Sequence, residues 1–69
     1  MDTEKHITLT GFSNISWKDA ITKTITEAAK SIDYISSISV LEQSAKIDGN
    51  MIVEYIATID LAFRIDSSR

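Results

Sequence analysis

The first apolar pattern in the chain is an alternation between residues 6 and 12. The residues alternate between one side of an extended backbone (Ile7, Leu9, Gly11) and the other (His6, Thr8, Thr10, Phe12). A period of two is typical of a β-strand. The turn-forming residues of segment 11–14 then predict that this first strand is short.

A helical pattern follows this turn. Ser16 is a good N-cap residue, and its side chain can accept a hydrogen bond from the amide of Asp19. Asp19 can bond back to the cap and lies near the positive end of the helix dipole. Apolar and small residues then recur at spacings of three and four, at Trp17, Ala20, Ile21, Thr24, Ile25, Ala28, Ala29 and Ile32. We therefore expect one amphipathic helix from Trp17 to about Asp33.

Two extended segments fill the second half of the chain. Residues 36–47 are rich in β-branched and small polar side chains, and Asp48-Gly49-Asn50 is a hairpin signal. Residues 51–65 then alternate between an apolar face (Met51, Val53, Tyr55, Ala57, Ile59, Leu61, Phe63, Ile65) and a more polar one. The order is β-α-β-β. This predicts the α+β class, in a single domain over residues 1–69 with polar tails at 1–4 and 66–69.

The predicted lengths argue for self-assembly. A helix of about 17 residues spans about 25 Å, whereas a strand of about 15 residues reaches about 50 Å. The helix therefore cannot cover the whole sheet. We expect Leu61, Phe63 and Ile65 to extend beyond the helix, and Ile52 and Ile56 add apolar area to the opposite face. Uncovered apolar area of this kind marks an interface, here with further copies of the chain.

Composition narrows the classes of function. A domain of 69 residues has a marginal core, and the absence of cysteine excludes disulfides and thiolate metal sites. The net charge of −3 and the lack of a basic patch argue against nucleic acid as a partner. No apolar run approaches the ~18 residues of a membrane span, so we expect a soluble, cytoplasmic protein. No catalytic triad or phosphate-binding loop is visible, which predicts that the protein is not an enzyme.

The candidate ion ligands are few and scattered. His6 is the only histidine, and no second histidine or cysteine is available to complete a zinc site within one chain. Glu54 and Asp60 fall on the same face of the last strand. In a symmetric assembly of several chains, their copies would form a ring of carboxylates. Such a ring would bind a hard cation or pair with Lys46 and Arg64, and pairing is the favoured interpretation.

Several segments together resemble the dodecin family. Segment 11–20 is similar to the opening of a dodecin, with a strand ending in glycine and then Ser16-Trp17 at the start of the helix. Segments 40–43 and 53–58 resemble the second and third strands of the family, in register and without a gap. The resemblance implies a three-stranded antiparallel sheet partly wrapped around the helix, and a hollow homododecamer. For most members it also implies flavin bound in pairs where subunits meet.

The residues that would bind flavin are absent at the corresponding positions. The resemblance places Ser37 where flavin-binding members have a stacking tryptophan, and Ile56 where they have a glutamine. Ser37 has no ring, and Ile56 cannot form a hydrogen bond with the polar edge of a flavin. Trp17 matches a structural tryptophan of the family. Glu42 belongs to a Glu-Gln pair that also occurs in a flavin-free, calcium-associated branch of the family.

Three hypotheses follow for the function. The first is a storage or binding shell whose flavin site has degenerated and which takes another small ligand or an ion, with calcium as the candidate. The second is a scaffold without any ligand. The third is a weak flavin site that uses backbone groups and Tyr34, which lies near Ser37 and provides a partial stacking surface. Tyr34 and Glu42 are also the residues that could close the site or repel a flavin.

Overall fold

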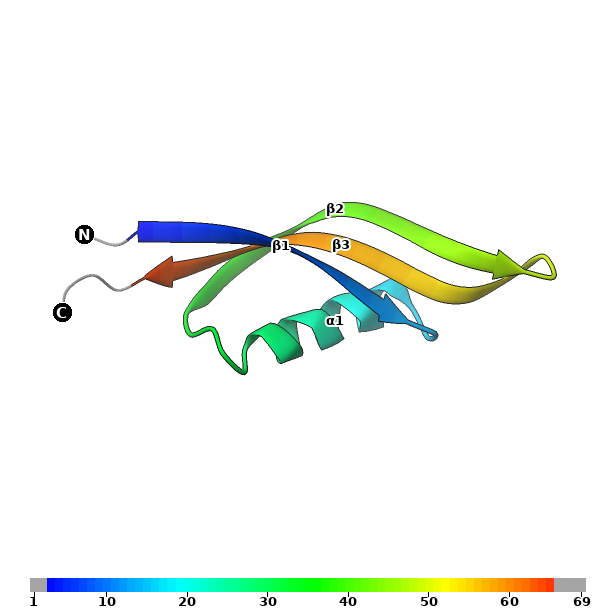
Figure 1. Ribbon diagram of the computed structural model, residues 1–69, viewed down its shortest axis with the longest axis horizontal. Helices are drawn as coiled ribbons and strands as arrows, with labels where there is room; N and C mark the ends of the chain where they lie inside the picture. Colours follow the sequence, from blue (N-terminus) through cyan, green and yellow to red (C-terminus); the bar gives the residue numbers. More distant parts are fainter. Residues whose placement is uncertain (1–2, 66–69) are drawn as a thin grey trace.

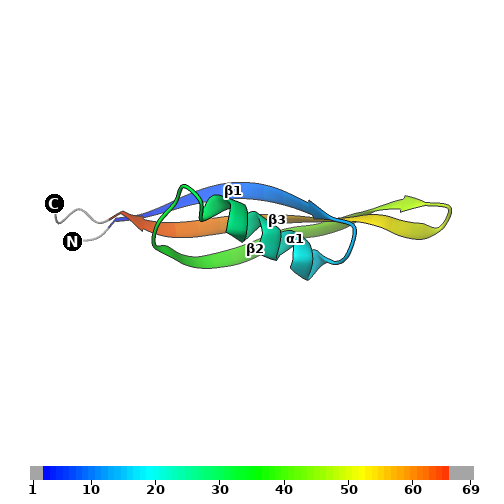
Figure 2. The same cartoon turned by 90° about the horizontal axis from the view of Figure 1, so that it is seen from below.

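The computed structural model describes residues 3–65. It contains β1 (Thr3–Ser13), α1 (Trp17–Ala28), β2 (Ile35–Asp48) and β3 (Met51–Ile65). The strands form one antiparallel three-stranded sheet in the order β1-β3-β2, so the last strand of the chain is the central one. The helix lies against one face of this sheet (Figure 1, Figure 2). The predicted α+β class and β-α-β-β order are confirmed.

The connection between β2 and β3 is a tight two-residue turn. Gly49 has a φ of 60° and Asn50 a φ of 64°, and Asp48 pairs with Met51 across the turn. Two successive residues with positive φ form the type I′ turn that matches the twist of a hairpin, and Gly and Asn tolerate this conformation best. The hairpin signal in the sequence is therefore confirmed, and the bounds of β3 are those predicted.

The first strand is longer than its apolar pattern. It begins at Thr3, which pairs with Ile65, and Glu4 pairs with Arg64. The prediction of a polar tail over residues 1–4 is therefore wrong for residues 3 and 4, because pairing with the end of β3 extends the strand beyond its apolar stretch. Residues 1–2 and the predicted tail at 66–69 lie outside the described residues.

The helix is shorter than predicted. It ends at Ala28 rather than near Asp33. Beyond it, the amide of Lys30 donates to the carbonyl of Glu27 and the amide of Ser31 to that of Ala28, both at 3.2 Å. Such bonds between residues three apart tighten the last turn of a helix. The chain then turns toward β2 through Tyr34, whose φ of 59° is uncommon for a bulky residue.

The core is small and lies where the helix crosses the sheet. Its buried apolar residues are Ala20, Ala57, Ile59, Leu61 and Ala62, and only Ile59 and Leu61 are large and fully buried. The expectation that Leu61 lies beyond the helix is wrong. The loop from β1 leads directly into α1, so the helix packs over the middle of β3 and Leu61 is fully buried, whereas Ile65 at the end of the strand is 37% exposed, as expected.

A group of exposed apolar side chains lies at the opposite end of the sheet. The β2–β3 hairpin extends well past the helix (Figure 1). Its apolar side chains remain exposed there, by 60% at Ile47, 70% at Met51, 43% at Ile52 and 48% at Val53. We call residues 47–53 the hairpin end. Among the described residues no helix is long and apolar enough to cross a membrane.

Candidate functional site

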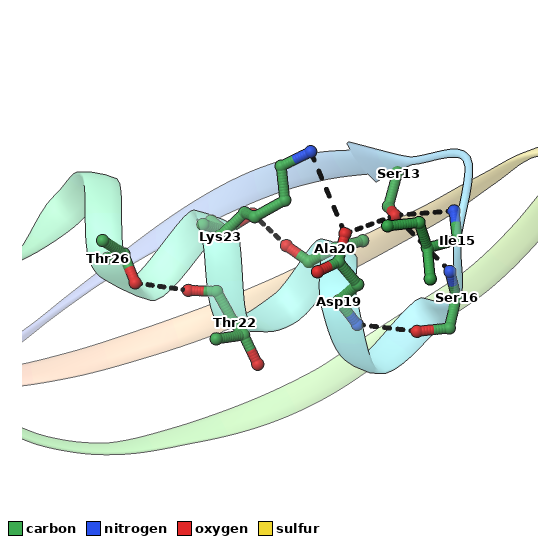
Figure 3. A network of polar contacts seen from close by, with 9 residues as sticks. Ser13, Ile15, Ser16, Asp19, Ala20, Thr22, Lys23 and Thr26 are labelled. Carbon is green, nitrogen blue, oxygen red and sulfur yellow. Dashed lines mark hydrogen bonds and ion pairs between the residues drawn. The ribbon is translucent and has the colours of Figure 1, made fainter.

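The start of the helix is held by a compact polar network (Figure 3). Ser16 Oγ accepts a hydrogen bond from the amide of Asp19 at 2.9 Å. The Asp19 carboxylate does not return to the cap, however, but accepts from Ser13 Oγ at 2.6 Å. Ser13 Oγ in turn accepts from the amide of Ile15 at 2.9 Å. The nearly buried Ser13, which sequence reasoning missed, thus joins the end of β1 to the first turn of α1.

This network predicts different costs for its two serines. Ser16→Ala should lower the free energy of unfolding by about 1 kcal/mol, the usual cost of losing an N-cap. Ser13→Ala should cost at least as much, because it leaves the Ile15 amide without its acceptor and the Asp19 carboxylate without its hydroxyl donor. Urea unfolding followed by circular dichroism measures both. A Ser13→Ala variant as stable as the wild type would contradict this assignment.

Trp17 connects the helix to the sheet. Its Nε1 donates to the carbonyl of Ser44 at 2.8 Å, and its ring meets Tyr55 edge to face, with centroids 4.8 Å apart and planes at 78°. Tyr55 shares the helix-facing side of β3 with the core residues Ala57 and Ile59. The indole is therefore engaged in packing on the side of the sheet opposite Ser37 and Ile56.

The two predicted flavin positions lie on the same face but far apart. Ser37 is exposed and pairs with Ala62, whereas Ile56 pairs with Ser44 and Phe12. Both belong to the face away from the helix. Ile56 and Ala62 are six positions apart on β3, which is about 20 Å at ~3.3 Å per residue. A single subunit therefore cannot present both positions to one flavin, and only a junction between subunits can bring them together.

The other two candidates for this region also do not converge within the subunit. Glu42 is exposed, pairs with Thr58, and lies between the Ser37 and Ile56 positions on the same face. Tyr34 lies in the turn before β2 with its side chain exposed by 64%. Its carbonyl accepts from the amide of Arg64 at 3.1 Å, which fastens this turn to the end of β3.

The acidic candidates are separated in the same way. Glu54 pairs with Lys46 near the hairpin end, whereas Asp60 is about 20 Å away along the strand at ~3.3 Å per residue. Arg64 lies opposite Glu4 and Lys46 opposite Glu54, so the hairpin register does not bring these two basic residues near each other. Within residues 3–65 no three His, Cys, Asp or Glu side chains are grouped to hold a metal ion. A ring of carboxylates requires several subunits.

His6 lies between two carboxylates on the face away from the helix. Its Nδ1 is 2.7 Å from Asp60 Oδ2 and its Nε2 is 3.3 Å from Glu4 Oε1. The hydrogen bond with Asp60, aided by the negative charges of Asp60 and Glu4, raises the pKa of His6 above its ordinary value of 6.5. Only the protonated ring can donate to both carboxylates. His6 therefore acts as a clamp between β1 and β3.

This clamp predicts a dependence of stability on pH. Because the pKa of His6 is raised in the folded state, its stabilising contribution is complete below pH 6.5 and is lost as the pH rises through the folded-state pKa. The wild type should therefore be more stable near pH 6 than near pH 8.5 in urea unfolding. His6→Gln should reduce this difference. An equal pH dependence in the two proteins would contradict the clamp.

Comparison with known proteins identifies the fold and its family. The sequence model of the dodecin family matches residues 3–66. The chain belongs to the dodecin family. The resemblance inferred from the sequence is thereby confirmed. The comparison with curated protein sequences found no match.

Solved structures of other dodecins agree with this assignment. A point variant of the dodecin from T. thermophilus superimposes with a TM-score of 0.91 at 22% identity, over 97% of this chain and 100% of the other. The dodecin from Streptomyces davaonensis gives 0.89 at 21% identity, over 96% and 97%. A calcium dodecin from Mycobacterium tuberculosis, described as calcium-chelating, gives 0.81 at 27% identity, over 97% and 96%.

In this dodecin, sequence reasoning identified His6 and Asp60 separately but missed their contact and the role of Glu4. Glu4 and His6 have the same parity on β1 and therefore share a face, which the sequence contained. Their meeting with Asp60 depends on the register between β1 and β3, two strands that are far apart in the sequence. No local signal in the sequence specifies that register.

Proposed function

We propose that this dodecin chain is the subunit of a hollow homododecameric shell that binds a small ligand or an ion and has no enzymatic activity. The observation that carries the proposal is the exposed apolar hairpin end, which the subunit itself cannot cover. Small domains without disulfides or metals are commonly stabilised by oligomerisation. That the shell works in the cytoplasm remains a prediction from the sequence.

The small core supports an obligate assembly. Only two large side chains, Ile59 and Leu61, are fully buried within the subunit, whereas Ile47, Met51 and Val53 are about half exposed or more. A free monomer would expose this apolar surface to water and be prone to aggregation. Obligate oligomers of this kind often have no stable folded monomer.

Light scattering or native mass spectrometry at micromolar concentration tests the assembly. We expect a species near twelve times the 7.7 kDa subunit mass. Val53→Asp should disrupt it by placing a charge on the hairpin end. The matched control Thr26→Asp, on the exposed side of α1, should leave it intact. A folded, soluble wild-type monomer would contradict the proposal.

An ion is the favoured ligand. The calcium dodecin from Mycobacterium tuberculosis is 27% identical over nearly the whole chain, and Glu42, Glu54 and Asp60 all lie on the face away from the helix. Symmetry would repeat these carboxylates around the axes of a shell, and carboxylate oxygens are the ligands that Ca²⁺ prefers. Calorimetry with calcium tests this, with Glu42→Gln and Asp60→Asn as variants. No heat of binding to the assembled wild type would favour the scaffold without ligand.

A weakened flavin site is the second part of the proposal. Ser37 offers no ring to stack on, and Ile56 cannot form a hydrogen bond with the flavin. The lost stacking costs ~1 kcal/mol of binding free energy, and leaving the polar edge of the flavin unpaired costs ~2 kcal/mol. We therefore predict a flavin affinity at least about a hundredfold below that of a dodecin with both groups. The double variant Ser37→Trp/Ile56→Gln should restore quenching of flavin fluorescence. Each single variant should restore less, because both side chains act on one ligand.

Two outcomes would contradict this prediction. Nanomolar quenching of flavin by the wild type would show that the site is intact and would favour a stacking role for Tyr34. An assembled double variant that still fails to bind flavin would show that Ser37 and Ile56 are not the deciding positions. In the second case Tyr34→Ala and Glu42→Gln in the double-variant background test whether either side chain blocks the site.

A further inference from the structure

Two side chains on β1, Glu4 and His6, have the spacing of a pair of metal ligands. Residues two positions apart on a strand project from the same face of the sheet. His6 Nε2 lies 3.3 Å from Glu4 Oε1. Two ligand atoms that are each about 2.0–2.1 Å from a tetrahedral Zn²⁺ lie about 3.3–3.4 Å from each other. The nitrogen and the oxygen therefore already have the separation that they would have around one ion.

Asp60 on β3 holds the imidazole of His6 in the orientation that a metal ligand needs. Its Oδ2 lies 2.7 Å from Nδ1, the other ring nitrogen. When Nδ1 donates its hydrogen to Asp60, the lone pair of Nε2 is left for an ion. A carboxylate in this place fixes the tautomer of a ligating histidine and makes the ring more basic. Asp60 therefore supports the ligand His6 and does not itself complete the ligand set.

The carboxylate of Glu4 is supported from β2. Ser36 Oγ lies 3.2 Å from Glu4 Oε2 and can donate a hydrogen bond to it, so that Oε1 is left facing His6. Arg64 is opposite Glu4 on β3, but within residues 3–65 the two side chains form no ion pair. All three strands thus contribute to one arrangement, in which each of the two ligands has its own hydrogen-bond partner.

The position is open to solvent and suits a particular class of ion. The side chains of His6 and Glu4 are 52% and 48% exposed, whereas that of Asp60 is 27% exposed. Two protein ligands leave the remaining positions of a tetrahedral ion to water or a small solute. One imidazole nitrogen with one carboxylate oxygen favours Zn²⁺ and similar transition metals, because Ca²⁺ takes oxygen ligands alone.

We propose that Glu4 and His6 form an open binding site for a divalent cation of the Zn²⁺ class, with Asp60 and Ser36 as positioning residues. The bound ion takes the place of the proton that His6 otherwise holds between Nε2 and Glu4, since a ligating histidine is neutral. Both ligands come from one strand of one subunit. The inference therefore does not depend on the proposed shell, and its ion and ligands differ from those of the calcium binding proposed for the shell.

Calorimetric titration with Zn²⁺ at pH 8, which favours the neutral imidazole, tests the site. We expect saturable binding of one Zn²⁺ per subunit. His6→Gln should weaken binding by more than the about 10–100-fold that is typical of losing an outer-shell group, and Asp60→Ala by an amount within that range. Asp60→Asn keeps an acceptor for Nδ1 and should weaken binding less than Asp60→Ala. The matched control Glu27→Gln, an exposed glutamate on α1, should leave the affinity unchanged.

A spectroscopic readout identifies the ligand directly. His6 provides the only imidazole in the chain, so paramagnetic resonance of bound Cu²⁺ should show coupling to an imidazole nitrogen that disappears in His6→Gln. Zn²⁺ binding that is absent from the wild type, or equally tight in His6→Gln, would overturn the inference. Light scattering on the same samples separates it from the proposed function. An intact shell that does not bind Zn²⁺ would overturn only the metal site, and a folded monomer that binds Zn²⁺ would overturn only the shell.

Discussion

Gly11→Ala should lower the free energy of unfolding by more than about 3 kcal/mol, beyond the usual range for overpacking, because the conflict involves backbone. A Cβ at Gly11 would overlap Thr24 Oγ1 and lie 2.7 Å from the carbonyl oxygen of Ala20. Thr24 cannot simply rotate away without breaking the hydrogen bond that its Oγ1 donates to that carbonyl. The helix would have to move off β1, which would open the core around Ala20. Urea unfolding, or the loss of soluble protein, measures the effect.

The chain provides a matched control for this prediction. Gly49 is its only other glycine, and nothing lies within 4 Å of a Cβ added there. Gly49→Ala should cost only about 1–2 kcal/mol, for a side chain in the left-handed region. If Gly11→Ala does not fold, the double variant Gly11→Ala/Thr24→Ala should recover part of the soluble protein. A Gly11→Ala variant no less stable than Gly49→Ala would contradict the close approach of α1 and β1.

Trp17→Ala should cost about 3 kcal/mol, the lower end of the range for removing a packed aromatic residue, because the indole is partly exposed. The substitution removes the edge-to-face contact with Tyr55 and the hydrogen bond to Ser44. It also frees the first turn of α1 from the base of the hairpin, so the proposed shell should dissociate at a lower urea concentration. Unfolding and native mass spectrometry on the same samples measure both effects.

Trp17→Phe separates the two contributions of the indole. It keeps a ring next to Tyr55 but leaves the Ser44 carbonyl without its donor, so we expect a loss of only about 1 kcal/mol. If Trp17→Ala left both stability and assembly unchanged, Trp17 would not be a structural anchor, and a role in ligand binding would have to be considered.

The parts of the fold that depend on neighbouring residues were predictable from the sequence. The N-cap at Ser16, the turn at Gly49-Asn50 and the alternation of β3 are local patterns, and the structure has each of them. The end of the helix was not predictable in this way. The apolar spacing continues to Ile32, but the chain must turn toward β2, so α1 ends at Ala28.

The candidate site was harder to predict than these local features, because it depends on pairing between segments that are far apart in the sequence. The resemblance assigned Ser37 and Ile56 to one binding site, but the sequence did not contain the distance between them, which follows from the pairing of β2 with β3. It also placed Leu61 beyond the helix, where the structure buries it, because strand lengths alone do not specify which part of β3 the helix covers. Asp60 and His6 meet only through the register of β1 with β3. Each of these features required the tertiary arrangement.

The position of β3 in the sheet has a consequence for the order of folding during synthesis. β1 and β2 do not pair with each other, and both depend on β3, which leaves the ribosome last of the three. Until then, the helix has no complete sheet to pack against, and no strand ladder can form. Pairings between such distant residues, such as Thr3 with Ile65, slow folding. The sheet can therefore form only after β3 has been translated. Until then, the apolar segments of the nascent chain stay exposed and accessible to chaperones.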